Sequence, residues 1–168
     1  MDNIIIRGTK FSTLEVRQLN IAFFLVPKKD VVYLKNNSTM RQALERMEYH
    51  HLYASVPIID DDGKYVGVLT GGDLLWKMKI TPGLTFMNTE KIRLDEIERH
   101  TQNNPVPVNA QMENLIVRAA DQNFVPVVDD NGIFIGIVRR SELIRYSVDC
   151  KNTSHYFTTV KHWRPNCC

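Results

Sequence analysis

The chain contains the stretch Val56-Pro57-Ile58-Ile59-Asp60-Asp61-Asp62-Gly63-Lys64-Tyr65-Val66-Gly67-Val68-Leu69, and 69 residues later it contains Val125-Pro126-Val127-Val128-Asp129-Asp130-Asn131-Gly132-Ile133-Phe134-Ile135-Gly136-Ile137-Val138. The two versions align without a gap, so the sequence predicts an internal repeat. In each version an apolar run follows the proline, an Asp/Asn-Gly pair reverses the chain, and a second apolar run follows. This order is typical of a β-hairpin whose strands are buried on both faces.

Helical patterns flank each hairpin. Apolar residues recur at helical spacing from Met40 to Met47, and Ser38 or Thr39 can cap this helix. The second copy repeats the spacing over 112–119, with Asn109 as the expected cap. We expect short strands before these two helices, at 31–34 and 106–108, and further helices after the hairpins, near 72–78 and 140–146.

Each copy therefore predicts the order β-α-β-β-α, and the whole chain predicts an α+β protein with pseudo-twofold symmetry. We expect the following divisions: an N-terminal helical segment at 1–25 with a helix over 12–25, a first motif at 26–80, a connector at 81–104, a second motif at 105–147 and a C-terminal tail at 148–168. Pro82-Gly83 is a strong turn signal and marks the start of the connector.

The composition excludes several classes of protein. A net charge of +2 over 168 residues, with acidic and basic residues interleaved, argues against a nucleic-acid partner. The sequence has neither an apolar run of about 18 residues nor the pattern of a signal peptide, so we expect no membrane span and a cytoplasmic protein. The three cysteines, Cys150, Cys167 and Cys168, lie in the tail and lack the paired spacing of a zinc site, so we expect no disulfide framework and no metal.

The first hairpin runs into Thr70-Gly71-Gly72-Asp73 at the start of a predicted helix. Main-chain N–H groups are unpaired at such a terminus, and a hydroxyl and a carboxylate one turn apart face the same way. These two side chains can hold the diol of a ribose, or they can simply cap the helix. In the second copy Arg139 and Glu142 stand in their places, so we expect one working site per chain.

These features resemble a tandem pair of cystathionine-β-synthase (CBS) domains over residues 26–147. The resemblance is carried by Gly67-Val68-Leu69-Thr70-Gly71-Gly72-Asp73 and by the Val-Pro-apolar-apolar-Asp stretch of each copy. In size the chain is similar to small stand-alone bacterial CBS-pair proteins. The resemblance implies a non-catalytic regulatory module that binds an adenine nucleotide (AMP, ADP, ATP or cyclic di-AMP), needs no cofactor, forms a homodimer and relays its state to a target protein.

The resemblance also implies a set of binding residues. The adenine would lie in a slot of the first motif, formed by Val31, Val32, Tyr53, Ala54, Ser55, Val56 and Pro57. Thr70 and Asp73 would hold the ribose, and Arg139 and Arg140 of the second motif would meet the phosphates. The corresponding slot of the second motif would involve Val106, Asn123, Phe124 and Val125.

Other functions stay open at this point. The chain could be a ligand-free structural or dimerisation module, or an accessory domain for S-adenosylmethionine or NAD. A DNA-binding regulator is disfavoured because the segment before Val26 is too short for a helix-turn-helix domain. An enzyme is disfavoured because the sequence lacks a nucleophile elbow, a P-loop or a zinc-protease motif, and because Asp60-Asp61-Asp62 sits at a predicted turn.

Overall fold

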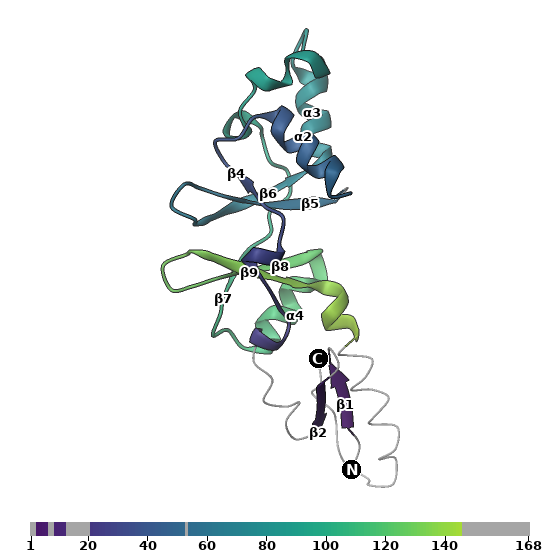
Figure 1. Ribbon diagram of the computed structural model, residues 1–168, viewed down its shortest axis with the longest axis vertical. Coiled ribbons are helices and arrows are strands. Elements are labelled where there is room, and N and C mark those ends of the chain that lie inside the picture. The colour runs from purple at the N-terminus through teal and green to yellow at the C-terminus, as the bar shows by residue number, and fades with distance from the viewer. Residues whose placement is uncertain (1–2, 7–8, 13–20, 53, 146–168) are drawn as a thin grey trace.

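The computed structural model describes residues 3–6, 9–12, 21–52 and 54–145, and Figure 1 shows their arrangement. Two β-α-β-β-α motifs follow one another, as the repeat predicts. The first consists of β4 (Leu34–Lys35), α2 (Met40–Tyr49), β5 (Ser55–Ile59), β6 (Tyr65–Thr70) and α3 (Gly71–Ile80). The second consists of β7 (Val106–Pro107), α4 (Met112–Asp121), β8 (Phe124–Val128), β9 (Phe134–Arg139) and a helix over 140–145.

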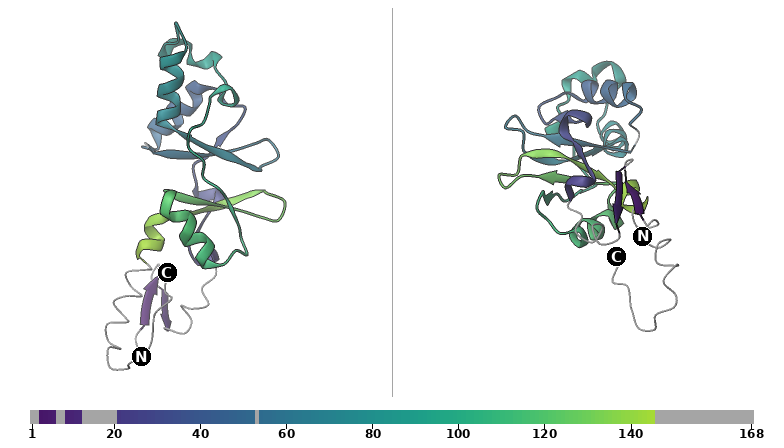
Figure 2. Two further views of the ribbon diagram at one scale, coloured as in Figure 1. Left: turned by 180° about the vertical axis from the view of Figure 1, so that it is seen from behind. Right: turned by 60° about the horizontal axis from the view of Figure 1, so that its bottom comes forward.

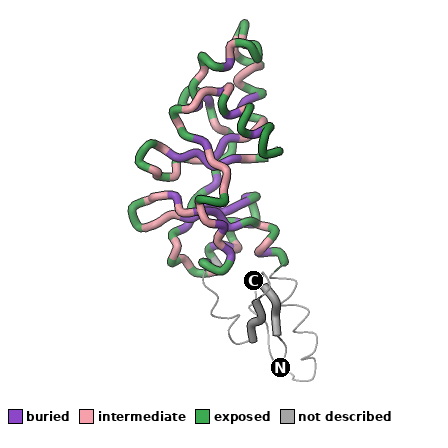
Figure 3. Tube along the Cα trace, in the orientation of Figure 1, coloured by how far each residue is buried: buried purple, intermediate pink, exposed green. Residues whose placement is uncertain are grey.

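The molecule has four layers, with two sheets inside and helices outside. The first sheet has the order β4-β5-β6, and the second has the order β3-β9-β8-β7, where β3 is Leu25–Pro27. Helices α2 and α3 cover one end and α4 covers the other, with the sheets facing each other between them (Figures 1 and 2). Buried residues gather along the strands of both sheets, whereas the hairpin tips are largely exposed (Figure 3).

Three apolar clusters build this arrangement. One lies between the first sheet and α2 and α3, and contains Met40, Ala43 and Met47 of the predicted helical face. A second lies between the second sheet and α4, and contains Leu115 and Ala119. The third, the inter-motif cluster, joins the two sheets and consists of Val26, Ile59, Val68, Phe124, Phe134 and Ile137. The two motifs therefore share one interior.

The hairpins turn at the predicted Asp/Asn-Gly pairs. Gly63 and Gly132 have φ angles of 84° and 79°, a region that glycine adopts without steric cost. The two tips also pair with each other, since the Tyr65 N–H donates to the Gly132 carbonyl at 3.2 Å and the Phe134 N–H donates to the Gly63 carbonyl at 2.9 Å. The acidic tip Asp60-Asp61-Asp62 is therefore part of a turn, with Asp60 Oδ1 accepting from the Lys64 N–H at 2.7 Å.

The helix expected over 12–25 is wrong for those of its residues that the structure describes. β1 (Asn3–Ile6) and β2 (Thr9–Ser12) form an antiparallel pair, Ile21–Phe23 is a single 3₁₀ turn (η1), and Leu25 begins β3. Residues 13–20 lie outside the described part. Ser12 and Leu25, the two ends of the expected helix over 12–25, instead lie in β2 and β3, and Ile21 and Phe24 are buried against the second motif.

Smaller differences concern the strands and caps of the two motifs. Thr39 caps α2, and its hydroxyl accepts from the Gln42 N–H at 3.3 Å. Helix α4 begins after Gln111 and has no side-chain cap, so the expected cap at Asn109 is wrong. Residues 31–33 are not part of a ladder, because a 3₁₀ turn at Lys28–Asp30 (η2) delays the first motif's leading strand to Leu34.

The repeat is not symmetrical in every loop. Helices α2 and α4 are related by a shift of 72 residues, whereas the hairpins are related by a shift of 69. The loop from α2 to β5 is thus three residues longer than the loop from α4 to β8. This longer loop borders the cavity described next.

Candidate functional site

A cavity of about 420 Å³ lies between the two motifs. Its volume falls within the range of roughly 300–1,000 Å³ that is typical of small-molecule sites. Residues of both motifs line it: Asp30, Val31, Val32, Leu52, Ser55, Pro57, Asn123, Phe124, Ile137, Arg139, Arg140 and Ser141. A ligand here would therefore touch both halves of the repeat.

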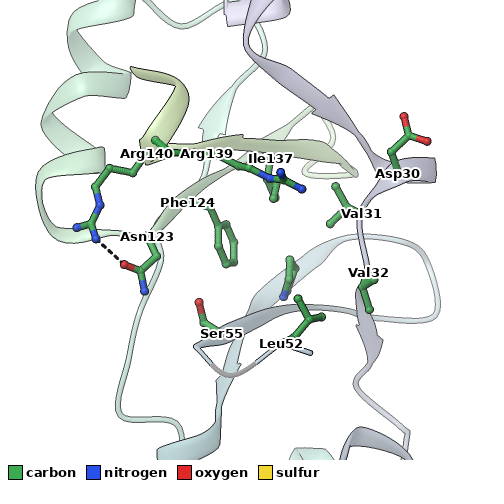
Figure 4. A pocket seen from close by; sticks show the side chains of 12 residues that line it. Asp30, Val31, Val32, Leu52, Ser55, Asn123, Phe124, Ile137, Arg139 and Arg140 are labelled. Carbon is green, nitrogen blue, oxygen red and sulfur yellow. Dashed lines mark hydrogen bonds between the residues drawn. The ribbon is translucent and has the colours of Figure 1, made fainter. Parts of the chain in front are cut away.

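The walls of the cavity are mainly apolar. Val31, Val32 and Leu52 contribute aliphatic side chains from the first motif, and Phe124 and Ile137 contribute theirs from the strands of the second. Figure 4 shows the Phe124 ring at the centre of the view, between the two sets. Such a surface can hold a flat, largely apolar ring such as a nucleobase.

Two arginines at the end of β9 bring positive charge, but they are used differently. The Arg140 guanidinium donates to Asn123 Oδ1 at 2.8 Å and its main-chain N–H donates to the Asn123 carbonyl at 3.2 Å. The Arg139 side chain has no hydrogen-bond or ion-pair partner among the described residues, and in Figure 4 it extends over Ile137 into the cavity. Arg139 is therefore available to an anionic ligand.

Thr70 and Asp73 lie elsewhere and are bonded to each other. Thr70 Oγ1 accepts from the Asp73 N–H at 3.1 Å, and Asp73 Oδ2 accepts from the Thr70 N–H at 2.8 Å and from the Thr70 hydroxyl at 2.7 Å. Together they form a capping box at the start of α3. Of the two interpretations that the sequence left open, the geometry realises helix capping.

The second oxygen of Asp73 is also occupied. Asp73 Oδ1 accepts from the His100 N–H at 3.0 Å and lies 3.2 Å from His100 Nδ1. The Asp73 side chain is 1% exposed. Burial raises the pKa of Asp73, but hydrogen bonds from the His100 main chain and from Thr70 outweigh that effect and leave the pKa below its ordinary value. The carboxylate is thus an internal anchor for the connector.

By the 69-residue shift of the repeat, Ser55 and Arg139 of the cavity correspond to Phe124 and Thr70. The polar groups beside these two positions are used within the chain. Asn103 is buried, its Nδ2 donates to the Phe124 carbonyl at 3.0 Å, and its own carbonyl accepts from the Tyr65 hydroxyl at 2.8 Å. The connector residues His100 and Asn103 therefore hydrogen-bond to Asp73 and to Phe124 beside these positions.

The structure brings six of the predicted residues together around the cavity: Val31, Val32, Ser55, Pro57, Arg139 and Arg140. Ala54 is exposed and Val56 is buried in the cluster beneath α2, and neither lines the cavity. Tyr53 lies outside the described residues. Alternation along β5 explains Val56, because successive side chains of a strand point to opposite faces.

Sequence reasoning missed several lining residues. Asn123 and Phe124 were assigned to a second slot, and Asp30, Leu52, Ile137 and Ser141 were not considered. Ile137 could have been found from its place two residues before Arg139 on one strand, since such residues share a face. The others depend on how the two motifs pack against each other.

The CBS domain family model matches residues 22–79 and 103–149, which is more than half of the chain. Together with the duplicated motif and the cavity between the copies, this match defines the class of protein. The chain belongs to the CBS domain family.

Individual relatives agree with this assignment. A CBS domain-containing protein of Dictyostelium discoideum is 27% identical over 123 residues, which cover 69% of this chain and 83% of the relative. The crystal structure of CbpB in complex with c-di-AMP has a TM-score of 0.71 at 20% identity and covers 86% of this chain and 93% of that one. The structure of CBSX2, a CBS-pair protein of Arabidopsis thaliana, in complex with AMP has a TM-score of 0.58 at 22% identity and covers 79% and 98%.

The described residues show neither a membrane-spanning helix nor a metal site. No helix found there is long and apolar enough to cross a membrane. The same part of the chain holds no group of three or more His, Cys, Asp or Glu side chains placed to bind a metal ion.

Proposed function

We propose that this protein is a regulatory module that binds an adenine nucleotide in the cavity between its two motifs, without converting it. One observation carries the proposal: a cavity of nucleotide size joins apolar walls from both motifs to Arg139 of the second motif, whose side chain has no partner among the residues that the structure describes. Apolar walls suit an adenine ring, and a guanidinium suits a phosphate. The CbpB and CBSX2 structures, solved with c-di-AMP and AMP, support the choice of adenine.

The regulatory part of the proposal follows from the position of the cavity. A ligand that contacts both motifs has a different affinity for each relative arrangement of them, and it shifts the population towards the arrangement that it fits best. We extend the proposal to a homodimer that passes this change to a target protein. In support, Leu75 and Ile144 occupy equivalent positions of the repeat and are both exposed, at 65% and 55%.

A thermal-shift and calorimetry screen tests nucleotide binding. The panel contains adenosine, AMP, ADP, ATP and cyclic di-AMP, with S-adenosylmethionine and NAD as competing adenosyl ligands and GMP as a base control. A true ligand at about 100 times its Kd stabilises the fold by about 2.7 kcal/mol. Chromatography of the same mixtures checks that the nucleotide is recovered unchanged.

A cavity-filling substitution tests whether the nucleotide binds in this cavity. Leu52→Trp puts a large ring into the cavity and is expected to abolish binding, whereas Val117→Trp places the same ring on an exposed position of α4 and is expected to leave binding intact. The proposal fails if none of the adenine compounds shifts the melting temperature, or if Leu52→Trp binds as tightly as the unmodified protein.

A further inference from the structure

The charges around the cavity are few. The described lining residues with a formal charge are Asp30, Arg139 and Arg140, which gives a net charge of +1. Each additional phosphate of a nucleotide brings further negative charge that needs its own partner. The number of available cations therefore bears on how many phosphates the cavity accepts.

Arg140 is not available in this arrangement. Its guanidinium is held by Asn123 Oδ1 at 2.8 Å and turns away from the cavity towards that residue (Figure 4). Binding a phosphate with Arg140 would first require breaking this bond. Arg139 remains as the cation that extends into the cavity without a partner in the described chain.

Two basic residues of the first motif contact an aromatic ring. Lys28 Nζ lies 5.4 Å from the centre of the Tyr33 ring, and the Arg46 guanidinium lies 6.0 Å from the same ring. Neither residue lines the cavity. Lys28 and Arg46 make cation–π contacts with Tyr33, and Lys29 is exposed and likewise does not line the cavity.

Asp30 adds a negative charge at the rim. It follows Lys28 and Lys29 in η2, is exposed, and carries its carboxylate beyond Val31, turned away from the centre of the cavity (Figure 4). A phosphate chain that extends past Arg139 towards this rim would approach a carboxylate. Like charges at short range are unfavourable.

Resting on the proposed function, we infer that the cavity accepts adenine nucleotides that place one isolated phosphate group against Arg139, either the monoester of AMP or one of the two separate diesters of cyclic di-AMP. We infer further that it discriminates against the directly linked phosphates of ADP and ATP. Arg139 binds the isolated group by its two-pronged guanidinium. Asp30 and the engaged Arg140 leave a second or third phosphate of the same chain without a partner.

Titration calorimetry at constant ionic strength, without divalent cations, tests this inference with adenosine, AMP, ADP, ATP and cyclic di-AMP. The expected result is that AMP or cyclic di-AMP binds about tenfold or more tightly than adenosine, the worth of one charge-assisted contact, and that ADP and ATP bind more weakly than AMP. The AMP and cyclic di-AMP arms separate the monoester from the diester. Binding of ATP as tight as that of AMP, or tighter, overturns the inference.

Variants assign the effect to its residues. Arg139→Ala is expected to reduce the affinity for AMP to that for adenosine, and Arg139→Gln, which keeps the length of the side chain, is expected to do the same. Arg118→Ala is the matched control, because Arg118 is an exposed arginine of α4 that does not line the cavity. Asp30→Asn is expected to narrow the difference between AMP and ATP by several-fold.

The outcomes separate this inference from the proposed function. If adenosine binds and AMP gains nothing, or if Arg139→Ala and Arg139→Gln keep full AMP affinity, the single-phosphate site is wrong while adenine binding stands. If no adenine compound binds at all, the proposed function itself is wrong. Circular dichroism of each variant establishes that it is folded before its affinity is interpreted.

Discussion

At the scale of single residues, Asp73 shows how one local pattern serves either of two purposes. A Thr-x-x-Asp stretch at a helix start can hold a ligand or close a capping box, and the sequence carries no information on which occurs. Here the carboxylate accepts four contacts from Thr70 and His100, and the side chain is 1% exposed. The deciding partner, His100, lies 27 residues away in the connector.

We predict that Asp73→Ala destabilises the fold and leaves nucleotide affinity in the cavity unchanged. The substitution removes the acceptor of the part-buried Thr70 and His100 N–H groups, and each donor that is left unsatisfied costs about 1–3 kcal/mol when water does not reach it. Urea unfolding measures the loss of stability. Loss of nucleotide binding by a variant of normal stability would contradict this prediction and restore Asp73 as a ribose ligand.

The pH dependence of Asp73→Asn provides the matched control. Because the pKa of Asp73 is lowered in the native state, the unfolded chain takes up a proton at a higher pH than the folded chain does. The contribution to stability is thus complete above about pH 3.9, the ordinary pKa of aspartate, and is lost as the pH falls from there to the native pKa. The unmodified protein is expected to lose more stability over that window than Asp73→Asn.

At the scale of elements, strand β3 depends on a glycine in its neighbour. β3 pairs with β9 in antiparallel register, with Pro27 opposite Gly136. A methyl group at Gly136 would overlap the Val26 carbonyl oxygen and lie 2.9 Å from Leu25 Cδ1. The absence of a side chain at Gly136 lets this strand approach closely.

Gly136→Ala is therefore expected to destabilise the protein by about 1–3 kcal/mol, the usual cost of forcing extra volume into a packed site. Gly72→Ala is the control, because a methyl group there meets its nearest neighbour, Thr70 Oγ1, at an ordinary 3.5 Å. Chemical unfolding of the two variants compares them. Equal stability of both would show that β3 is not held as described.

The elements differ in how far the sequence could predict them. The hairpins and α2 could be predicted because turn residues, apolar runs and helical spacing are local signals. The repeat also contains each of these patterns in both copies. β3 has three residues and gains its structure from β9, more than one hundred positions away. A local pattern cannot carry that information, and the helix expected over 12–25 extends into Leu25, the first residue of this strand.

At the scale of the whole molecule, the inter-motif cluster joins the two sheets. Phe134 lies in it with 1% exposure, and its ring centre is 6.4 Å from that of Tyr33 and 6.0 Å from that of Tyr65. The packing of the two motifs also decides which residues share the cavity. This packing could not be predicted from the sequence. The family resemblance alone implied that Arg139 lies near Val31 and Val32, and it implied a second slot for Phe124, which in the structure lines the same cavity as these residues.

We predict that the protein unfolds in one cooperative transition and that Phe134→Ala lowers its stability by about 3–5 kcal/mol, the usual cost of a large buried truncation. Tyr49→Ala removes an aromatic ring that is 80% exposed and is expected to change stability by about 0.5 kcal/mol or less. Calorimetry of both variants measures this. Two separate transitions in the unmodified protein would mean that the motifs are independent.

The pairing of β3 with β9 also constrains how the chain can fold during its synthesis. Leu25 is translated early, yet its partner Val138 follows more than one hundred residues later. At about 5–20 residues per second, the ribosome separates the two strands by several seconds. The second sheet therefore stays incomplete during elongation, and the closure of so long a segment favours slow folding.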